Sequence, residues 1–128
     1  MNICVLSSLL FLIPSYFGLK YGLIDIFVTC LMCSVTSVLY HITYAKYMFW
    51  LDVIVVNTIG AGYVYDAMVY RHGLYYWLTI LWSMFTIYVY MCTRTRAYSY
   101  HALVHMSAVT GIMCYVRGRI YDGFYDDI

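Results

Sequence analysis

The sequence predicts an all-α integral membrane protein, a bundle of about five transmembrane helices. Of its 128 residues, 65% are hydrophobic and only 10% are charged, whereas soluble domains carry about 25% charged residues. The apolar residues fall into five blocks, each close to the roughly 20 residues that cross a bilayer. Inside lipid, a helix satisfies all the backbone hydrogen bonds of one segment. We therefore expect each block to be a helix.

Charged, glycine and other turn residues separate the blocks, which we place at residues 3–19, 22–44, 47–69, 73–93 and 97–116. The first block is interpreted as a retained helix rather than a signal peptide, because no Lys or Arg precedes its hydrophobic run. Short connections make successive helices antiparallel neighbours. We expect residues 1–116 to form one bundle, and residues 117–128, with two glycines and three aspartates, to form a polar tail in water.

The charge argues against a nucleic-acid partner, and the cysteine spacing does not indicate a metal or redox site. The net charge is +1, and no basic run suggests a nucleic-acid partner. Three basic residues fall on one side of the predicted bundle and four on the other, so the orientation stays open. Cys30 and Cys33 have C-x-x-C spacing, but they lie within a helix and no second pair accompanies them. We interpret them as packing residues.

The fifth block contains two histidines, His101 and His105, four residues apart. Residues at this spacing lie on one face of a helix. Ionisable side chains inside a membrane are costly, and they usually face a partner, a cavity or a metal. Two imidazoles on one face can bind a divalent transition metal together with one or two further ligands.

Three more polar residues occur at the same predicted depth. Ser37 and His41 are also four apart, near the end of the second block, and Asp52 lies near the start of the third. The second helix ends on the side from which the third and fifth helices start. At 1.5 Å per residue, all five groups lie roughly 3 to 12 Å below one membrane face. The sequence thus predicts one shared site.

These residues suit a hydrolytic zinc site. Three imidazoles with one open position form a catalytic zinc arrangement, in which the pKa of a bound water falls to about 7. Asp52 would accept the proton of that water or fix an imidazole tautomer. Ser37 would donate a hydrogen bond to the metal-bound oxygen or to a developing oxyanion. At this depth the site would reach the amide or ester bonds of lipids.

Each residue also has a structural interpretation. A histidine in a membrane helix can make an interhelical hydrogen bond, Ser37 can bond the carbonyl four residues before it, and Asp52 can sit at the interface near a helix start. Away from the cluster, we expect Asn57 to pack between helices. The groups expected to be solvated or exposed are Asp25, Asp66 and His72.

The segments Ser37-Val-Leu-Tyr-His41 and His101-Ala-Leu-Val-His105, with Asp52 between them, resemble the S-x-x-x-H, D and H-x-x-x-H motifs of the CREST superfamily. That group includes alkaline ceramidases, PAQR receptors with hemolysin-III-like proteins, and GPI-anchor lipid-remodelling hydrolases with their myomaker relatives. The remodelling and myomaker branch looks closest. The resemblance covers the first three helices and the last, about two thirds of the chain.

The resemblance implies a Zn2+ ion held by His41, His101 and His105, with Ser37 and Asp52 beside these ligands. It implies hydrolysis of an amide or ester bond in a membrane lipid such as a ceramide, a glycerolipid or a GPI-type lipid. The chain departs from the family in helix number, since the family has seven helices and we count five. Loss of an even number between the aspartate helix and the last helix preserves the side from which the last helix starts.

Three functions remain open at this stage. The first is a zinc-dependent lipid hydrolase. The second keeps the fold without catalysis, in lipid sensing, membrane remodelling or fusion. The third is a haem-binding bundle, which is disfavoured because ligands four apart on one helix cannot take opposite faces of one haem. The sequence leaves the organelle open, and also whether the chain forms a homo-oligomer.

Overall fold

The computed structural model describes residues 2–126, which form five helical rods and no strand. The all-α prediction is confirmed. The first rod is nearly continuous and contains a short 3-10 segment, and another 3-10 turn precedes the last helix. The elements are α1 (Ile3–Ser8), η1 (Leu9–Phe11), α2 (Leu12–Lys20), α3 (Ile24–Thr43), α4 (Lys46–Val69), α5 (Leu74–Thr93), η2 (Tyr98–Tyr100) and α6 (His101–Asp126).

Four of the rods are long and apolar enough to cross a membrane: Ile3–Lys20, Ile24–Thr43, Lys46–Val69 and Leu74–Thr93. They match the first four predicted blocks to within two residues at each end. The fifth predicted block is also helical, but α6 is not among these four. Two histidines and several small polar residues make its first turns less apolar than the other rods.

α6 also continues well past residue 116, where we expected the helix to give way to a polar tail. The helix runs unbroken to Asp126, so residues 117–126 are helical. Ile120 is buried and joins the core formed with α3, α4 and α5. Gly118 packs so closely on Tyr76 of α5 that an added Cβ would lie 2.8 Å from the ring. This packing extends the bundle into the predicted tail.

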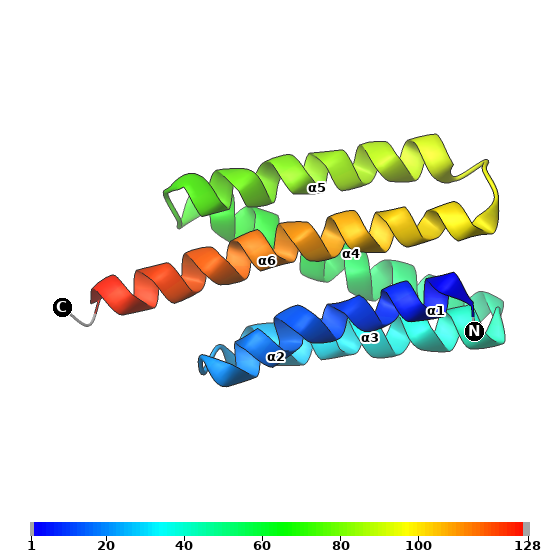
Figure 1. Cartoon of the computed structure of the whole chain (residues 1–128), viewed down its shortest axis with the longest axis horizontal. Coiled ribbons are helices and arrows are strands. Elements are labelled where there is room, and N and C mark those ends of the chain that lie inside the picture. Colours follow the sequence, from blue (N-terminus) through cyan, green and yellow to red (C-terminus); the bar gives the residue numbers. More distant parts are fainter. Residues whose placement is uncertain (1, 127–128) are drawn as a thin grey trace.

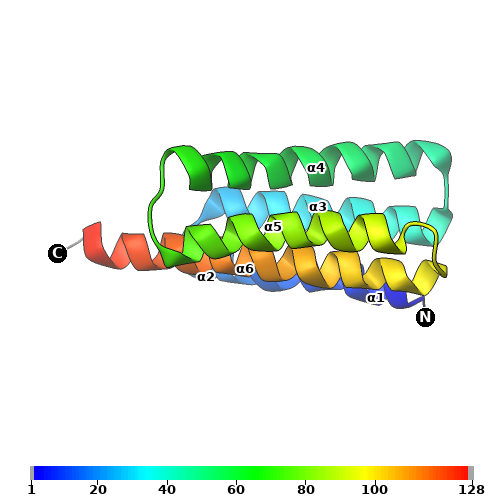
Figure 2. The ribbon, with the colours of Figure 1, turned by 90° about the horizontal axis from the view of Figure 1, so that it is seen from above.

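The rods lie side by side, with successive rods running in opposite directions (Figure 1). The first rod lies along α3, and α5 lies along α6, while α4 forms the remaining edge (Figure 2). The N-terminus, the α3–α4 turn and the α5–α6 connection share one end, and the C-terminus extends from the other (Figure 1). The arrangement therefore puts the end of α3 and the starts of α4 and α6 together.

The opposite end of the bundle carries a network of ionic and tyrosine side chains. Arg119 of α6 pairs with Asp25 of α3 at 2.9 Å, and Tyr115 of α6 donates a 2.5 Å hydrogen bond to Asp66 of α4. Asp66, which we expected to be solvated, is thus bonded within the bundle, because α6 continues beyond the predicted span. Further members of the network are Arg71, Tyr76 and Asp122.

Candidate metal centre

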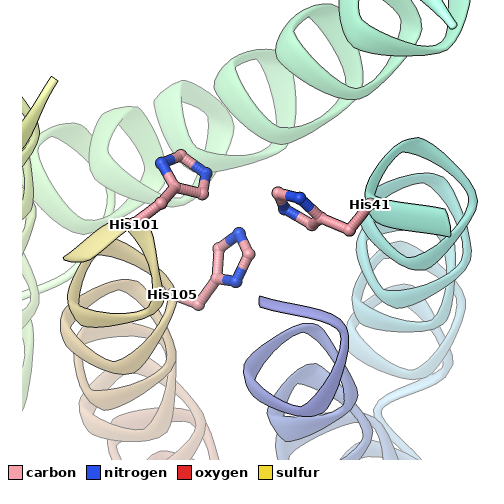
Figure 3. A group of neighbouring side chains, drawn as sticks. All are labelled: His41, His101 and His105. Carbon is pink, nitrogen blue, oxygen red and sulfur yellow. The ribbon is translucent and has the colours of Figure 1, made fainter. Parts of the chain in front are cut away.

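His41, His101 and His105 point toward one another at the end of the bundle that holds the N-terminus (Figure 3). His41 lies in the last turn of α3, and the other two lie in the first two turns of α6. The ring centroids are 4.8 to 5.3 Å apart. One nitrogen from each ring lies within 4.8 Å of the other two. The structure thus brings the three predicted ligands together.

The cluster can bind a metal ion. Zinc bonds of about 2.0–2.1 Å in tetrahedral geometry place ligand nitrogens about 3.3 Å apart. Small inward movements of the rings, on the order of 1 Å, would bring all three nitrogens to that spacing. The donor set suits zinc and also suits other transition metals that imidazole binds, such as copper, nickel and iron.

His41 provides an independent indication of a ligand. Its side chain is 1% exposed, and Nε2 has no hydrogen-bond partner. Among the residues that the structure describes, this is the one buried side-chain nitrogen or oxygen without a partner. A buried polar atom left unpaired costs about 1–3 kcal/mol, so such an atom calls for a specific explanation. A metal ion at the centre of the cluster provides one.

The other ring nitrogen, Nδ1, is held by a hydroxyl group in two of the three histidines. Ser7 Oγ of α1 lies 2.8 Å from His105 Nδ1, and the Tyr98 hydroxyl in η2 is hydrogen-bonded to His41 Nδ1. Sequence reasoning missed both hydroxyl groups. A signal for Ser7 was present, because Ser7 and Ser8 form a polar pair in an apolar helix, at the same end as the histidines.

Ser37 and Asp52 also come together inside the bundle. Ser37 Oγ donates a 2.7 Å hydrogen bond to Asp52 Oδ1, and Thr36 Oγ1, which we did not predict, donates a second one of 3.0 Å. Ser37 bonds the carboxylate rather than the carbonyl four residues before it. Asp52 is 7% exposed, so it faces the interior and not the interface. Ser37 is one turn from His41 on α3.

Two turns of the chain create this arrangement. Tyr44 ends α3 in the left-handed conformation, with φ of 54°. Only Tyr44 and Ala45 then separate α3 from α4, so the first turns of α4 lie back against the last turns of α3. At the same end, the connection after α5 leads through η2 directly into His101. The three histidines and the Ser37–Asp52 pair therefore lie near the same end of the bundle, because the end of α3 and the starts of α4 and α6 come together there.

The remaining polar residues that we singled out lie outside this cluster. His72 is exposed in the connection between α4 and α5, as predicted. Asn57 is exposed, and its amide donates to the Val53 carbonyl of its own helix at 2.7 Å. We had expected it to pack between helices, but this bond satisfies the amide within α4. Cys30 and Cys33 are buried and free, in agreement with a packing role.

A scan against protein-family models, a search of curated proteins and a search of solved structures each find no match. The resemblance to the CREST superfamily therefore rests on the motifs alone, and the function has to be argued from the site.

Proposed function

We propose that this protein is a membrane-embedded, zinc-dependent hydrolase that cleaves the amide or ester bond of a membrane lipid. The observation that carries the proposal is the cluster of three histidines with the unpaired, buried Nε2 of His41. Ser37, one turn before His41 on α3, is hydrogen-bonded to Asp52, the residue to which we assign the acid–base role.

Zinc is the metal that we propose for this cluster. Three histidines with a fourth position left open are a recurring catalytic zinc arrangement. When bound, zinc supplies Lewis acidity, which activates water and polarises a carbonyl oxygen. Both effects favour hydrolysis of an acyl bond.

Asp52 is the group that we assign to proton transfer. Both hydrogen bonds from Ser37 and Thr36 go to its Oδ1, which fixes the orientation of the carboxylate and leaves Oδ2 outside these two bonds. We assign to Oδ2 the proton of the attacking water and its later transfer to the leaving nitrogen or oxygen. Ser37 and Thr36 act by holding the carboxylate in place.

A cavity in the bundle supports a lipid as the substrate. It has a volume of about 520 Å³ and lies between α4, α5 and α6, within the range of about 300–1,000 Å³ usual for ligand pockets. Its lining is mainly apolar, from residues such as Val56, Ile87 and Ala108. Phe11 also lines it and lies edge-on to the His105 ring, with centroids 5.9 Å apart. An acyl chain in this cavity would extend toward the histidines.

The proposal is tested by measuring fatty acid released from ceramide, glycerolipid and GPI-type lipids by the detergent-purified protein. We expect Asp52→Asn to lower the rate by about 100-fold or more, as loss of a general base does. His105→Ala should abolish activity, because it removes one of the three groups that would hold the ion. His72→Ala, which changes an exposed histidine away from the cluster, should retain the wild-type rate. A wild-type protein that is loaded with zinc but inert on all three lipids would contradict hydrolysis and favour a non-catalytic role in lipid sensing, membrane remodelling or fusion.

A further inference from the structure

We infer that Ser7 and Tyr98 are positioning residues that fix the tautomers of His105 and His41, so that Nε2 of each ring faces the centre of the cluster. The inference deepens the proposed function and rests on it, because it assigns which nitrogens would hold the ion. It concerns two hydroxyl groups from α1 and η2, elements that carry none of the three histidines.

The hydrogen bonds of Ser7 determine the tautomer of His105. Ser7 Oγ lies 3.0 Å from the Cys4 carbonyl and 2.8 Å from His105 Nδ1. Ser8 Oγ donates to the same carbonyl at 2.7 Å and lies farther from Nδ1, at 3.5 Å, so Ser7 is the main partner of the ring. A serine hydroxyl has one proton, and a carbonyl can only accept. The proton of Ser7 therefore goes to Cys4, and a lone pair of Oγ is left to accept from Nδ1–H of His105. In a neutral imidazole the second nitrogen then carries no proton, so Nε2 is free to ligate.

The same reasoning applies to His41. Its Nδ1 is hydrogen-bonded to the Tyr98 hydroxyl, and its Nε2 is buried with no partner. A proton on Nε2 would be a buried donor without an acceptor, which is costly. A proton on Nδ1, donated to the Tyr98 oxygen, avoids the unpaired donor and leaves on Nε2 a lone pair that the ion would accept.

Tyr98 also covers the cluster from the side of the α5–α6 connection. Its ring centroid lies 5.5 Å from that of His41, and it stacks on His101 with centroids 6.5 Å apart. Ser7 approaches His105 from the first rod, whose α1 ribbon passes beside the cluster (Figure 3). The two histidines are therefore fixed by two segments that lie far apart in the sequence, α1 and η2. Loss of such a partner to a ligating histidine costs about 10–100-fold in metal affinity.

The tautomers can be measured directly in the metal-free protein. Long-range proton–nitrogen spectra of protein labelled with 15N-histidine, in detergent micelles, report which ring nitrogen carries the proton. We expect wild-type His105 and His41 to be protonated at Nδ1. Ser7→Ala should convert His105 alone to a mixture of tautomers, and Tyr98→Phe should do so for His41. The matched control is Ser15→Ala, because Ser15 is another buried serine of the first rod, and it donates to the Phe27 carbonyl at 2.9 Å.

Zinc affinity, measured by competition with a chelator, gives the second readout. We expect Ser7→Ala to weaken zinc binding about 10–100-fold, Ser7→Thr to restore it, and Ser15→Ala to leave it unchanged. Wild-type spectra with the proton of His105 on Nε2 would overturn the inference without any variant. A Ser7→Ala protein with the same His105 tautomer and the same zinc affinity as Ser15→Ala would also overturn the inference. Wild-type protein with the expected tautomers and no zinc binding would uphold the hydrogen bonding and contradict the proposed function.

Discussion

Ser37 Oγ lies 2.7 Å from Asp52 Oδ1, although the two residues belong to different helices and are 15 positions apart. Both side chains are buried, at 1% and 7% exposure. The bond joins the last turns of α3 to the first turns of α4, close to His41. The bond therefore contributes to the stability of the fold and also orients the Asp52 carboxylate. Thermal unfolding measures the first contribution.

Ser37→Ala should destabilise the protein by about 1.5–3 kcal/mol, the usual contribution of a hydrogen bond to a charged group. The substitution leaves the buried carboxylate with the Thr36 bond as its remaining hydroxyl contact. The measurement is thermal unfolding in detergent. Ser83→Ala is the control, because the Ser83 hydroxyl donates to the Thr79 carbonyl of its own helix. Equal unfolding temperatures for the two variants would show that the interhelical bond contributes nothing.

Tyr115→Phe should destabilise the bundle and leave the metal centre intact. It removes the 2.5 Å hydrogen bond to Asp66 and a 3.2 Å contact with Arg119, which we expect to cost about 1–3 kcal/mol. Zinc stoichiometry should not change, because this network lies at the opposite end of the bundle. Tyr47→Phe, at a residue 72% exposed, should change neither property. Loss of zinc in Tyr115→Phe would contradict the separation of the two ends.

Gly118→Ala should lower stability by about 1–3 kcal/mol, the usual cost of overpacking. The new Cβ would lie 2.8 Å from a ring atom of Tyr76, so α5 and α6 would have to separate. Gly62→Ala is the matched control within a helix, since nothing lies within 4 Å of its added Cβ. There we expect a gain of about 0.5–1 kcal/mol, because alanine is the better helix former. Unfolding midpoints that rise in both variants would refute the close contact.

For the proposed lipid hydrolysis, Gly60→Leu should shift the substrate preference toward shorter acyl chains. Gly60 lines the cavity between α4, α5 and α6, and an added Cβ there meets no atom within 4 Å. A leucine side chain can therefore enter the cavity and shorten it. Gly62→Leu is the matched control, because Gly62 has the same free space and does not line the cavity. Chain-length profiles are compared with a series of ceramides, and identical profiles for the two variants would contradict an acyl chain in this cavity.

Much of the fold could be predicted because the composition constrains it strongly. Long apolar blocks with short breaks predict antiparallel helices, and the direction of each helix then determines which ends meet. That argument placed His41, Asp52 and His101 at one end of the bundle. In the structure they lie in the last turn of α3, the first two turns of α4 and the first turn of α6, and these helix ends share one end of the bundle (Figure 1). To predict which residues share an end of the bundle, one needs only the number of helices between them. The breaks between the apolar blocks give that number.

The rotation of each helix about its axis could not be predicted in the same way. Ser7 and Ser8 are the polar residues of the short helix α1. The sequence shows that they are polar, but it does not say which side of that helix faces His105. Thr36 was missed for the same reason. Its neighbour Ser37 was expected to face the site, but only the rotation of α3 shows that both hydroxyl groups reach Asp52. Residues 117–126 were expected to lie in water because they are rich in charged residues. The sequence does not show that Arg119 pairs with Asp25 of another helix within the bundle.

The most direct test of the central claim is the zinc content of the protein purified in detergent, measured by elemental analysis together with the visible absorption spectrum. We predict about one zinc ion per chain in the wild type and in His72→Ala, and no haem absorption. In His41→Ala, His101→Ala and His105→Ala we predict less than about a tenth of that zinc, with the helical circular dichroism retained. A wild-type protein without zinc, or the same zinc content in the three variants, would contradict the metal centre.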